Sequence, residues 1–329
     1  MVARKDERAG TASWIRGALS AGTAIPGFNI PYLPMMAPVV QALRDCRVRG
    51  LIMVARLEWI KFKSGSPRAI RDAYEGVRDP EYTRLHLDHV PVIDEDDLRV
   101  PYRDVIAEAL DLGYESVMVD GSRLSLDENI ACTAAVVELA RPYGVPVEGE
   151  LGAVMGHESG PMPSYEELFA SRKGFTDPAD AARFVRETDV DWLSVAIGNI
   201  HGAISAAAKG LEKPRARLDL EHLGRLYAAT GIPLVLHGGT GIAPELVRAA
   251  LAQGIAKINV ATAIRQPYER TVSQGVPAAQ QAVYETMVRL LRTELQVDHN
   301  TGRQYRGTLC NRIQRLLCFS GIVVFSRSP

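Results

Sequence analysis

The feature that most constrains the fold is a regular alternation of short apolar runs with longer stretches of helical periodicity. Eight such runs occur before residue 261, and several are apolar at nearly every position. Nearly continuous apolar runs are typical of strands buried on both faces, and strands that alternate with helices indicate parallel βα units. We expect strands at 25–30, 51–56, 84–88, 115–120, 145–151, 190–197, 232–237 and 255–260.

Helix-start signals between these runs support the assignment. Ser125 followed by Glu128 is a capping-box pattern, and Asp177 stands where an N-cap is expected before Pro178. Pro244 occupies the first position of a later helix in the same way.

Eight strand–helix units in 329 residues predict one domain, because a (β/α)8 barrel takes about 250 residues. We therefore predict a single (β/α)8 TIM barrel over residues 1–298, with an N-terminal helix and a C-terminal helical extension. Residues 299–329 are assigned to that extension without a structural interpretation. The segments 152–176 and 198–218 are long connections that leave the carboxyl ends of strands, where barrel enzymes place their chemistry.

Composition excludes several classes of protein. The 38 basic and 39 acidic residues are mixed along the chain, so no basic stripe suggests nucleic acid. Four scattered cysteines suggest no disulfide framework. The polar N-terminus does not resemble a signal peptide, and the apolar run 316–325 is too short to cross a membrane. A cytoplasmic protein without a membrane or nucleic-acid partner is expected.

Three of the seven histidines lie at or just past predicted strand ends: His89, His201 and His237. In a barrel, the carboxyl ends of all strands meet at one rim, so these imidazoles are expected to converge. Three imidazoles with one open position are a ligand set of catalytic zinc. One such histidine is usually only a hydrogen-bonded residue, but three on one rim favour a metal site.

Acidic residues lie near the same rim. Asp88 precedes His89, so its carboxylate can exchange a proton with a substrate hydroxyl or orient a ligand. Asp120 and Glu150 end the fourth and fifth strands, where they could hold a second metal or support the histidines. Glu158, in a glycine-containing loop, is a candidate mobile general base, although it could also be an ordinary solvated acid.

A glycine-rich turn follows the seventh strand. The sequence LHGGTG places Gly238, Gly239 and Thr240 directly after His237, and the eighth strand ends near Asn259 and Thr262. Backbone N–H groups in such a turn can approach an anion, and a phosphate site after strands 7 and 8 recurs in this barrel. The pattern predicts a phosphate-binding region.

Seven motifs resemble, in the same order, those of the class II zinc-dependent ketose-bisphosphate aldolases, which include fructose- and tagatose-bisphosphate aldolases. The resemblance extends from Gly22 to Ile264 and is carried by HLDHV, VMVDGSRLSLDENI, VEGELG, TDPADAARFV, SVAIGNIHG, LVLHGGTGI and KINVAT.

The resemblance implies an aldehyde-lyase that reversibly cleaves a phosphorylated ketose to dihydroxyacetone phosphate and an aldehyde. It implies one Zn²⁺ per subunit, with a second divalent or a monovalent cation also compatible, and a homodimer or homotetramer. His89, His201 and His237 would bind zinc, Asp88 would be the acid/base at the C4 oxygen, and Glu158 would take the C3 proton. The substrate-binding positions would be Asn29, Gly202, Gly238, Gly239, Thr240, Asn259 and Thr262.

Some positions depart from the family pattern. Tyr32, Arg56 and Arg123 stand where asparagine, serine or glutamine, and histidine are usual, and Glu58 also changes the charge of the pocket. The sequence therefore does not name the aldehyde. Two alternatives stay open at this point: a metal-dependent hydrolase on the same barrel, and a non-catalytic member of the family. Lys257 would be the nucleophile of a Schiff-base aldolase, but a histidine rim favours a structural or phosphate-adjacent role for it.

Overall fold

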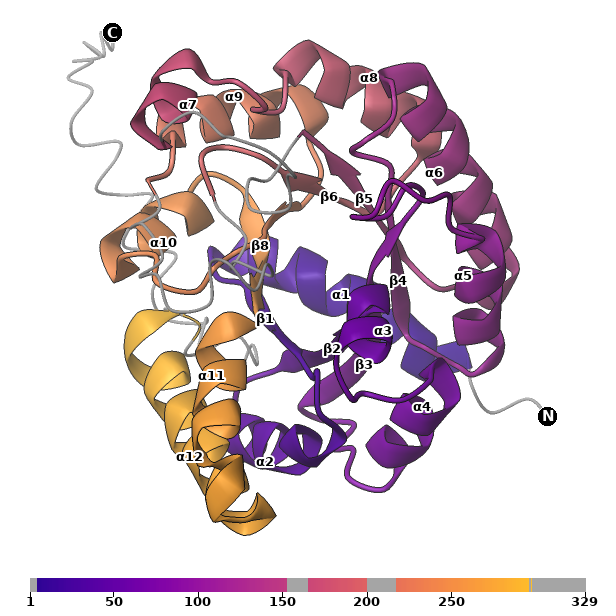
Figure 1. The fold of residues 1–329 in the computed structure, drawn as a ribbon. Coiled ribbons are helices and arrows are strands. Elements are labelled where there is room, and N and C mark those ends of the chain that lie inside the picture. The colour runs from indigo at the N-terminus through magenta and orange to yellow at the C-terminus, as the bar shows by residue number, and fades with distance from the viewer. Residues whose placement is uncertain (1–4, 153–164, 200–216, 296, 298–329) are drawn as a thin grey trace, which may run out of the picture.

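The computed structural model describes residues 5–152, 165–199, 217–295 and 297. Eight parallel strands form a closed barrel in the order β1 to β8, and helices surround it as a ring (Figure 1). The predicted barrel is therefore confirmed. Within the described residues, no helix combines the length and the apolar character needed to span a membrane.

The strands are β1 (Ile25–Asn29), β2 (Gly50–Ala55), β3 (Thr83–Pro91), β4 (Ser116–Asp120), β5 (Val147–Leu151), β6 (Trp192–Val195), β7 (Leu234–Leu236) and β8 (Ile255–Val260). The helices are α1 (Lys5–Ala21), α2 (Met36–Cys46), α3 (Arg56–Lys61), α4 (Pro67–Glu75), α5 (Tyr102–Asp111), α6 (Leu126–Ala140), α7 (Tyr165–Ser171), α8 (Pro178–Thr188), α9 (Leu220–Thr230), α10 (Pro244–Leu251), α11 (Thr262–Thr271) and α12 (Val276–Arg289).

The strand positions agree with the sequence prediction, and the largest difference is at β3, which continues to Pro91. The caps form as expected: Ser125 accepts a hydrogen bond from the Glu128 N–H, and Asp177 accepts from the N–H groups of Ala179 and Asp180. The long connection after β5 contains α7. Residues 153–164 of that connection, most of the connection after β6 and the predicted extension 299–329 lie outside the described residues.

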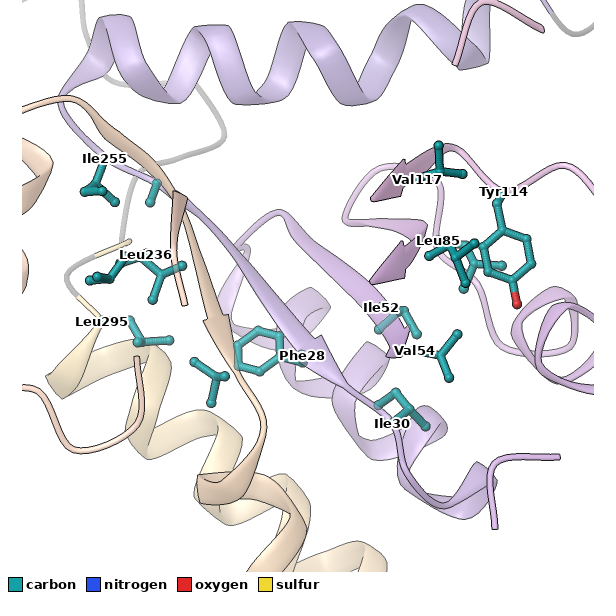
Figure 2. Close-up of a cluster of buried hydrophobic side chains, with 14 of the residues drawn as sticks. Phe28, Ile30, Ile52, Val54, Leu85, Tyr114, Val117, Leu236, Ile255 and Leu295 are labelled. Carbon is teal, nitrogen blue, oxygen red and sulfur yellow. The ribbon is translucent and has the colours of Figure 1, made fainter. Parts of the chain in front are cut away.

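The strands divide their side chains between two environments because successive residues point to opposite faces. The outward-facing side chains pack between the strands and the surrounding helices (Figure 2). Phe28, Ile52, Val54 and Leu85 belong to this outer core, in which Leu295 also packs. The outer core holds the helices on the barrel, which leaves the inward-facing positions free for other chemistry.

The amino-terminal end of the barrel interior is apolar and is closed by α1. Trp14, Ile15 and Ala18 of this helix cluster with residues at or near the strand starts, namely Ile25, Leu51, Met53, Trp192, Val235 and Ala256. The guanidinium carbons of Arg84 and Arg49 lie 4.3 and 4.9 Å from the centroid of the Trp14 ring. The cluster that closes this end is therefore apolar, with the two arginines packed on its Trp14 ring.

Replacing Trp14 should destabilise the barrel without changing its chemistry. We expect Trp14→Ala to lower the free energy of unfolding by about 3–5 kcal/mol, because it opens a cavity and removes two cation–π contacts. Trp14→Phe should recover more than half of that loss. Urea unfolding of the three proteins measures it, and a loss below about 1 kcal/mol in Trp14→Ala would contradict the closing role of α1.

Candidate active site at the carboxyl ends of the strands

An irregularity in β3 creates the centre of the site. Leu87 pairs with Val117 of β4, but the next pair joins Val90 with Val119, so β3 contains one extra residue at this point. His89 takes up the extra length with φ 29°, a backbone conformation that is rare outside glycine. Strict alternation would send Asp88 and His89 to opposite faces. The bulge instead brings both side chains into the same site.

His89 and His237, 148 residues apart in the sequence, meet across the barrel. Nε2 of His89 lies 2.7 Å from Nδ1 of His237, and the two rings are nearly perpendicular. Asp88 completes a group in which one ligand atom from each residue lies within 4.8 Å of the others. Nitrogen and carboxylate oxygen atoms gathered at this spacing can hold a divalent metal.

A second group shares His89. Its Nδ1 lies 3.3 Å from Asp120 Oδ2 and 3.7 Å from Glu150 Oε2, and the three residues form a further set suited to a metal. Glu150 Oε2 is buried and has no hydrogen-bond partner within the described structure, although it also lies 3.7 Å from His237 Nδ1. A buried carboxylate oxygen without a donor is costly, and a bound cation would satisfy it.

The charges in this region favour a bound cation. Burial raises the pKa of Glu150 well above its usual range, and the negative charge of Asp120 adds to the effect. Burial lowers the pKa of His89, but Glu150, Asp88 and Asp120 together raise it to about 10. Without a metal, a proton on His89 supplies positive charge to this acidic group. A bound divalent metal would supply that charge in place of the proton. The donor set fits a metal on both geometry and charge.

Two amides hold Asp88 in place. Asn29 Nδ2 donates to Oδ2 at 2.9 Å, and Asn259 Nδ2 donates to Oδ1 at 3.0 Å. Burial raises the pKa of Asp88, but the charges of His89 and Lys257 and the contact with His86 outweigh it, so the pKa lies well below the usual value. Asp88 is therefore an ionised carboxylate in a fixed orientation.

Glu58 lies on the other side of Asn29, whose Nδ2 is 3.5 Å from Glu58 Oε2. The same oxygen accepts the Ala55 N–H at 2.8 Å, which anchors the start of α3. Burial is the main cause that raises the pKa of Glu58 to about 8, and the charge of Asp88 adds to it. A second carboxyl group, largely protonated at neutral pH, thus borders the pocket near Asp88.

Glu148 lies beneath the candidate ligands and was missed by the sequence analysis. Its Oε1 accepts from His237 Nε2 at 2.9 Å, and its Oε2 lies 2.8 Å from Lys257 Nζ. Burial raises its pKa, but Lys257 and His237 lower it to about 2. A signal was present in VEGEL: Glu148 and Glu150 are two residues apart on one strand and therefore share a face.

The loop after β7 approaches the end of β8 closely. The Gly239 N–H donates to the main-chain oxygen of Asn259 at 3.0 Å, and a Cβ on Gly239 would lie 2.5 Å from Ile258 Cγ2, so only glycine fits. Gly238 adopts φ 68°. Thr240 Oγ1 accepts the Ala263 N–H at 3.4 Å, beside the start of α11 at Thr262. The residues predicted to bind phosphate therefore lie together.

Three predicted residues fall outside the described structure: His201, Gly202 and Glu158. The positions that depart from the family pattern are described and are bonded to their neighbours. Arg56 Nη1 lies 3.3 Å from Asp94 Oδ2, and Arg123 Nη2 lies 3.2 Å from Asp97 Oδ1. Tyr32 donates to Glu269 Oε1 at 2.8 Å and stacks on Tyr268.

Comparisons with known proteins identify the family of the chain. The family model for class II fructose-bisphosphate aldolase matches residues 10–306. A fructose-bisphosphate aldolase from Streptococcus pyogenes is 33% identical over 253 residues, which is 76% of this chain and 77% of that protein. A probable fructose-bisphosphate aldolase from Bacillus subtilis is 30% identical over 293 residues, covering 84% and 93%. The crystal structure of the YdjI aldolase from Escherichia coli superposes with a TM-score of 0.68 at 26% identity, covering 88% and 98%.

The closed parallel barrel and these matches define a lyase of the aldolase class, and the chain belongs to the class II fructose-bisphosphate aldolase family. It is an aldehyde-lyase of carbohydrate metabolism, from a family that acts on phosphorylated sugars. The hydrolase and non-catalytic alternatives are thereby set aside. The family is generally zinc-dependent, and the two groups around His89 are where a metal would bind.

The strained backbone of His89 leads to a test by substitution. In metal-free protein, we expect His89→Gly to be more stable than His89→Ala by about 1 kcal/mol, because glycine adopts positive φ without penalty. In a regular strand the order would be reversed, since glycine weakens strands. Urea unfolding in the presence of a chelator compares the two variants. Equal stability, or a more stable alanine variant, would contradict the bulge.

The raised pKa of Glu58 predicts a pH dependence. The folded state binds this proton more tightly than the unfolded chain, so the stabilising contribution is complete below about pH 4.5 and is lost as the pH rises through about 8. Between about pH 5 and pH 8.5, wild-type protein should lose on the order of a few kcal/mol relative to Glu58→Gln. Unfolding curves of both proteins at the two pH values measure the difference. If the free energies of unfolding of the two proteins change with pH by the same amount, the pKa of Glu58 is not raised.

Proposed function

We propose that the protein is a zinc-dependent aldolase that cleaves a phosphorylated ketose of the fructose- or tagatose-bisphosphate type to dihydroxyacetone phosphate and an aldehyde. The observation that carries the proposal is the pair formed by His89 and His237, with Asp88 held beside it. His89 Nε2 and His237 Nδ1 would bind the metal, and Asp120 and Glu150 would hold a second cation or support the first. Bound zinc would act as a Lewis acid towards the substrate carbonyl.

Asp88 is the proposed acid/base at the C4 oxygen. In cleavage, its ionised carboxylate accepts the C4 hydroxyl proton as the C3–C4 bond breaks and the C4–O bond becomes a carbonyl. The electron pair of the broken bond passes towards the C2 carbonyl, and C3 is then protonated. The amides of Asn29 and Asn259 orient both carboxylate oxygens, so the proton acceptor is placed before substrate binds.

The loop after β7 and the start of α11 are the proposed phosphate site. Gly238, Gly239 and Thr240 bring the loop backbone and a hydroxyl to the end of β8, where the Gly239 N–H holds the loop on Asn259. Helix α11 begins at Thr262 with the positive end of its dipole. A phosphate in this position would place the dihydroxyacetone half of the substrate close to His237 and Asn259.

Other parts of the proposal rest on the family pattern. His201 is proposed as the third zinc ligand, Glu158 as the base at C3, and Gly202 as a phosphate contact. Asn199, two residues before His201 in the sequence, donates to the main-chain oxygen of His237 at 3.1 Å, so the described chain after β6 reaches the candidate metal-binding rim at Asn199. A homodimer or homotetramer, a cytoplasmic location and a monovalent cation stay predictions from the sequence.

Proton exchange separates the two halves of the reaction. With zinc bound, the wild-type protein should exchange a C3 hydrogen of dihydroxyacetone phosphate with deuterium from solvent, and a chelator should abolish the exchange. Asp88→Asn should lower kcat for ketose cleavage by about 10²–10⁴-fold, because it removes the C4 base. The same variant should retain C3 exchange, since Asp88 acts on C4.

The matched control is Asp104→Asn, which changes an exposed acid of α5 and should leave both activities unchanged. Exchange that persists without metal would exclude zinc dependence. Equal loss of exchange and cleavage in Asp88→Asn would exclude the assignment of Asp88 to C4. Cleavage rates for a panel of phosphorylated ketoses identify the natural substrate.

A further inference from the structure

Glu148 occupies the centre of the barrel interior, one layer below the proposed metal site. Its side chain is fully buried, and both carboxylate oxygens contact donors from other strands. Oε1 lies 2.9 Å from His237 Nε2, and Oε2 lies 2.6 Å from Trp192 Nε1 and 2.8 Å from Lys257 Nζ. Residues of β5, β6 and β8, and His237 directly after β7, therefore meet at this one carboxylate.

We propose that Glu148 is a positioning residue that holds His237 in the tautomer whose Nδ1 carries the lone pair that would bind metal, and that Lys257 and Trp192 keep Glu148 in place for this purpose. The inference rests on the proposed zinc-dependent function. Glu148 itself would not touch the metal or the substrate.

The tautomer follows from the direction of the hydrogen bonds. An ionised carboxylate only accepts, so a contact of 2.9 Å with Glu148 requires the hydrogen of neutral His237 to lie on Nε2. The lone pair then lies on Nδ1, which faces His89 Nε2 at 2.7 Å and Glu150 Oε2 at 3.7 Å. Asn259 Nδ2 lies 3.1 Å from the same Nε2, and it donates to Asp88 Oδ1 at 3.0 Å, so the tautomer follows from the carboxylate of Glu148.

Lys257 and Trp192 explain why the carboxylate does not rotate away. Lys257 is fully buried, so its ammonium group has Glu148 as its counter-charge, and Trp192 closes the layer towards the apolar cluster under α1. A buried ion pair adds little net stability compared with apolar residues of the same volume. Its presence at this position is therefore better explained by the orientation of His237. This role also accounts for Lys257 without a Schiff base.

The test compares zinc affinity with stability. In Glu148→Gln, zinc affinity should fall by about 10–100-fold, as measured by competition with a chromogenic chelator. That variant also leaves Lys257 without its counter-charge, which lowers stability for a separate reason. The double variant Glu148→Gln/Lys257→Met removes both charges. It should unfold at a urea concentration near that of the wild type, yet keep the reduced zinc affinity.

A control uses a partly buried carboxylate of the same barrel. Glu115 pairs with Arg84 at 3.2 Å and accepts the Leu85 N–H at 2.9 Å, and neither partner is a proposed ligand, so Glu115→Gln should bind zinc as the wild type does. If the double variant binds zinc with wild-type affinity, the positioning role is wrong while the proposed function stands. If the wild type itself binds no zinc, both are wrong.

A second measurement needs no variant of Glu148. In ¹⁵N-histidine-labelled wild-type protein without metal, the His237 ring should show a protonated Nε2 and an unprotonated Nδ1, with the signal assigned by its loss in His237→Gln. Nδ1 protonation with Nε2 unprotonated would overturn the inference even if the Glu148 variants did not fold.

Discussion

The site depends on one extra residue in β3. Because strand side chains alternate, a regular β3 could present either Asp88 or His89 to the barrel interior, but not both. The bulge at His89 removes this restriction and places the proposed proton acceptor directly beside the first proposed metal ligand. The backbone strain is tolerated because the flanking strands are paired on both sides and packed into the outer core.

The interior is arranged in layers along the barrel axis. Apolar residues under α1 close one end, and Glu148 with Lys257 forms a charged layer above them. The histidines and the remaining acids lie at the carboxyl end. Charges become more numerous towards this end, and Glu150 keeps an oxygen without a donor in the described structure. A bound cation and an anionic substrate would complete this arrangement.

The part of the rim that would contact the aldehyde has residues that differ from the family pattern. Arg56 and Arg123 contact acids on the segment that follows β3, and Tyr32 contacts Glu269 and Tyr268. These contacts therefore hold the three side chains against neighbouring residues at the rim. Glu58, a residue of α3 that is buried beside Asn29, adds a carboxyl group near Asp88. This carboxyl group is not one of the proposed metal ligands. Selectivity for the aldehyde is expected to depend on these residues.

The sequence by itself determined the barrel, the strand positions and five of the residues that the structure brings together at the rim, namely Asp88, His89, Asp120, Glu150 and His237. Apolar periodicity and capping patterns are local, and parallel strands bring their carboxyl ends to one edge without further information. The tertiary structure alone decided the bulge at His89, the contact of Asn29 and Asn259 with Asp88, and the role of Glu148 under His237. Each of these depends on register and distance between strands far apart in the chain, and no spacing along the sequence encodes such distances.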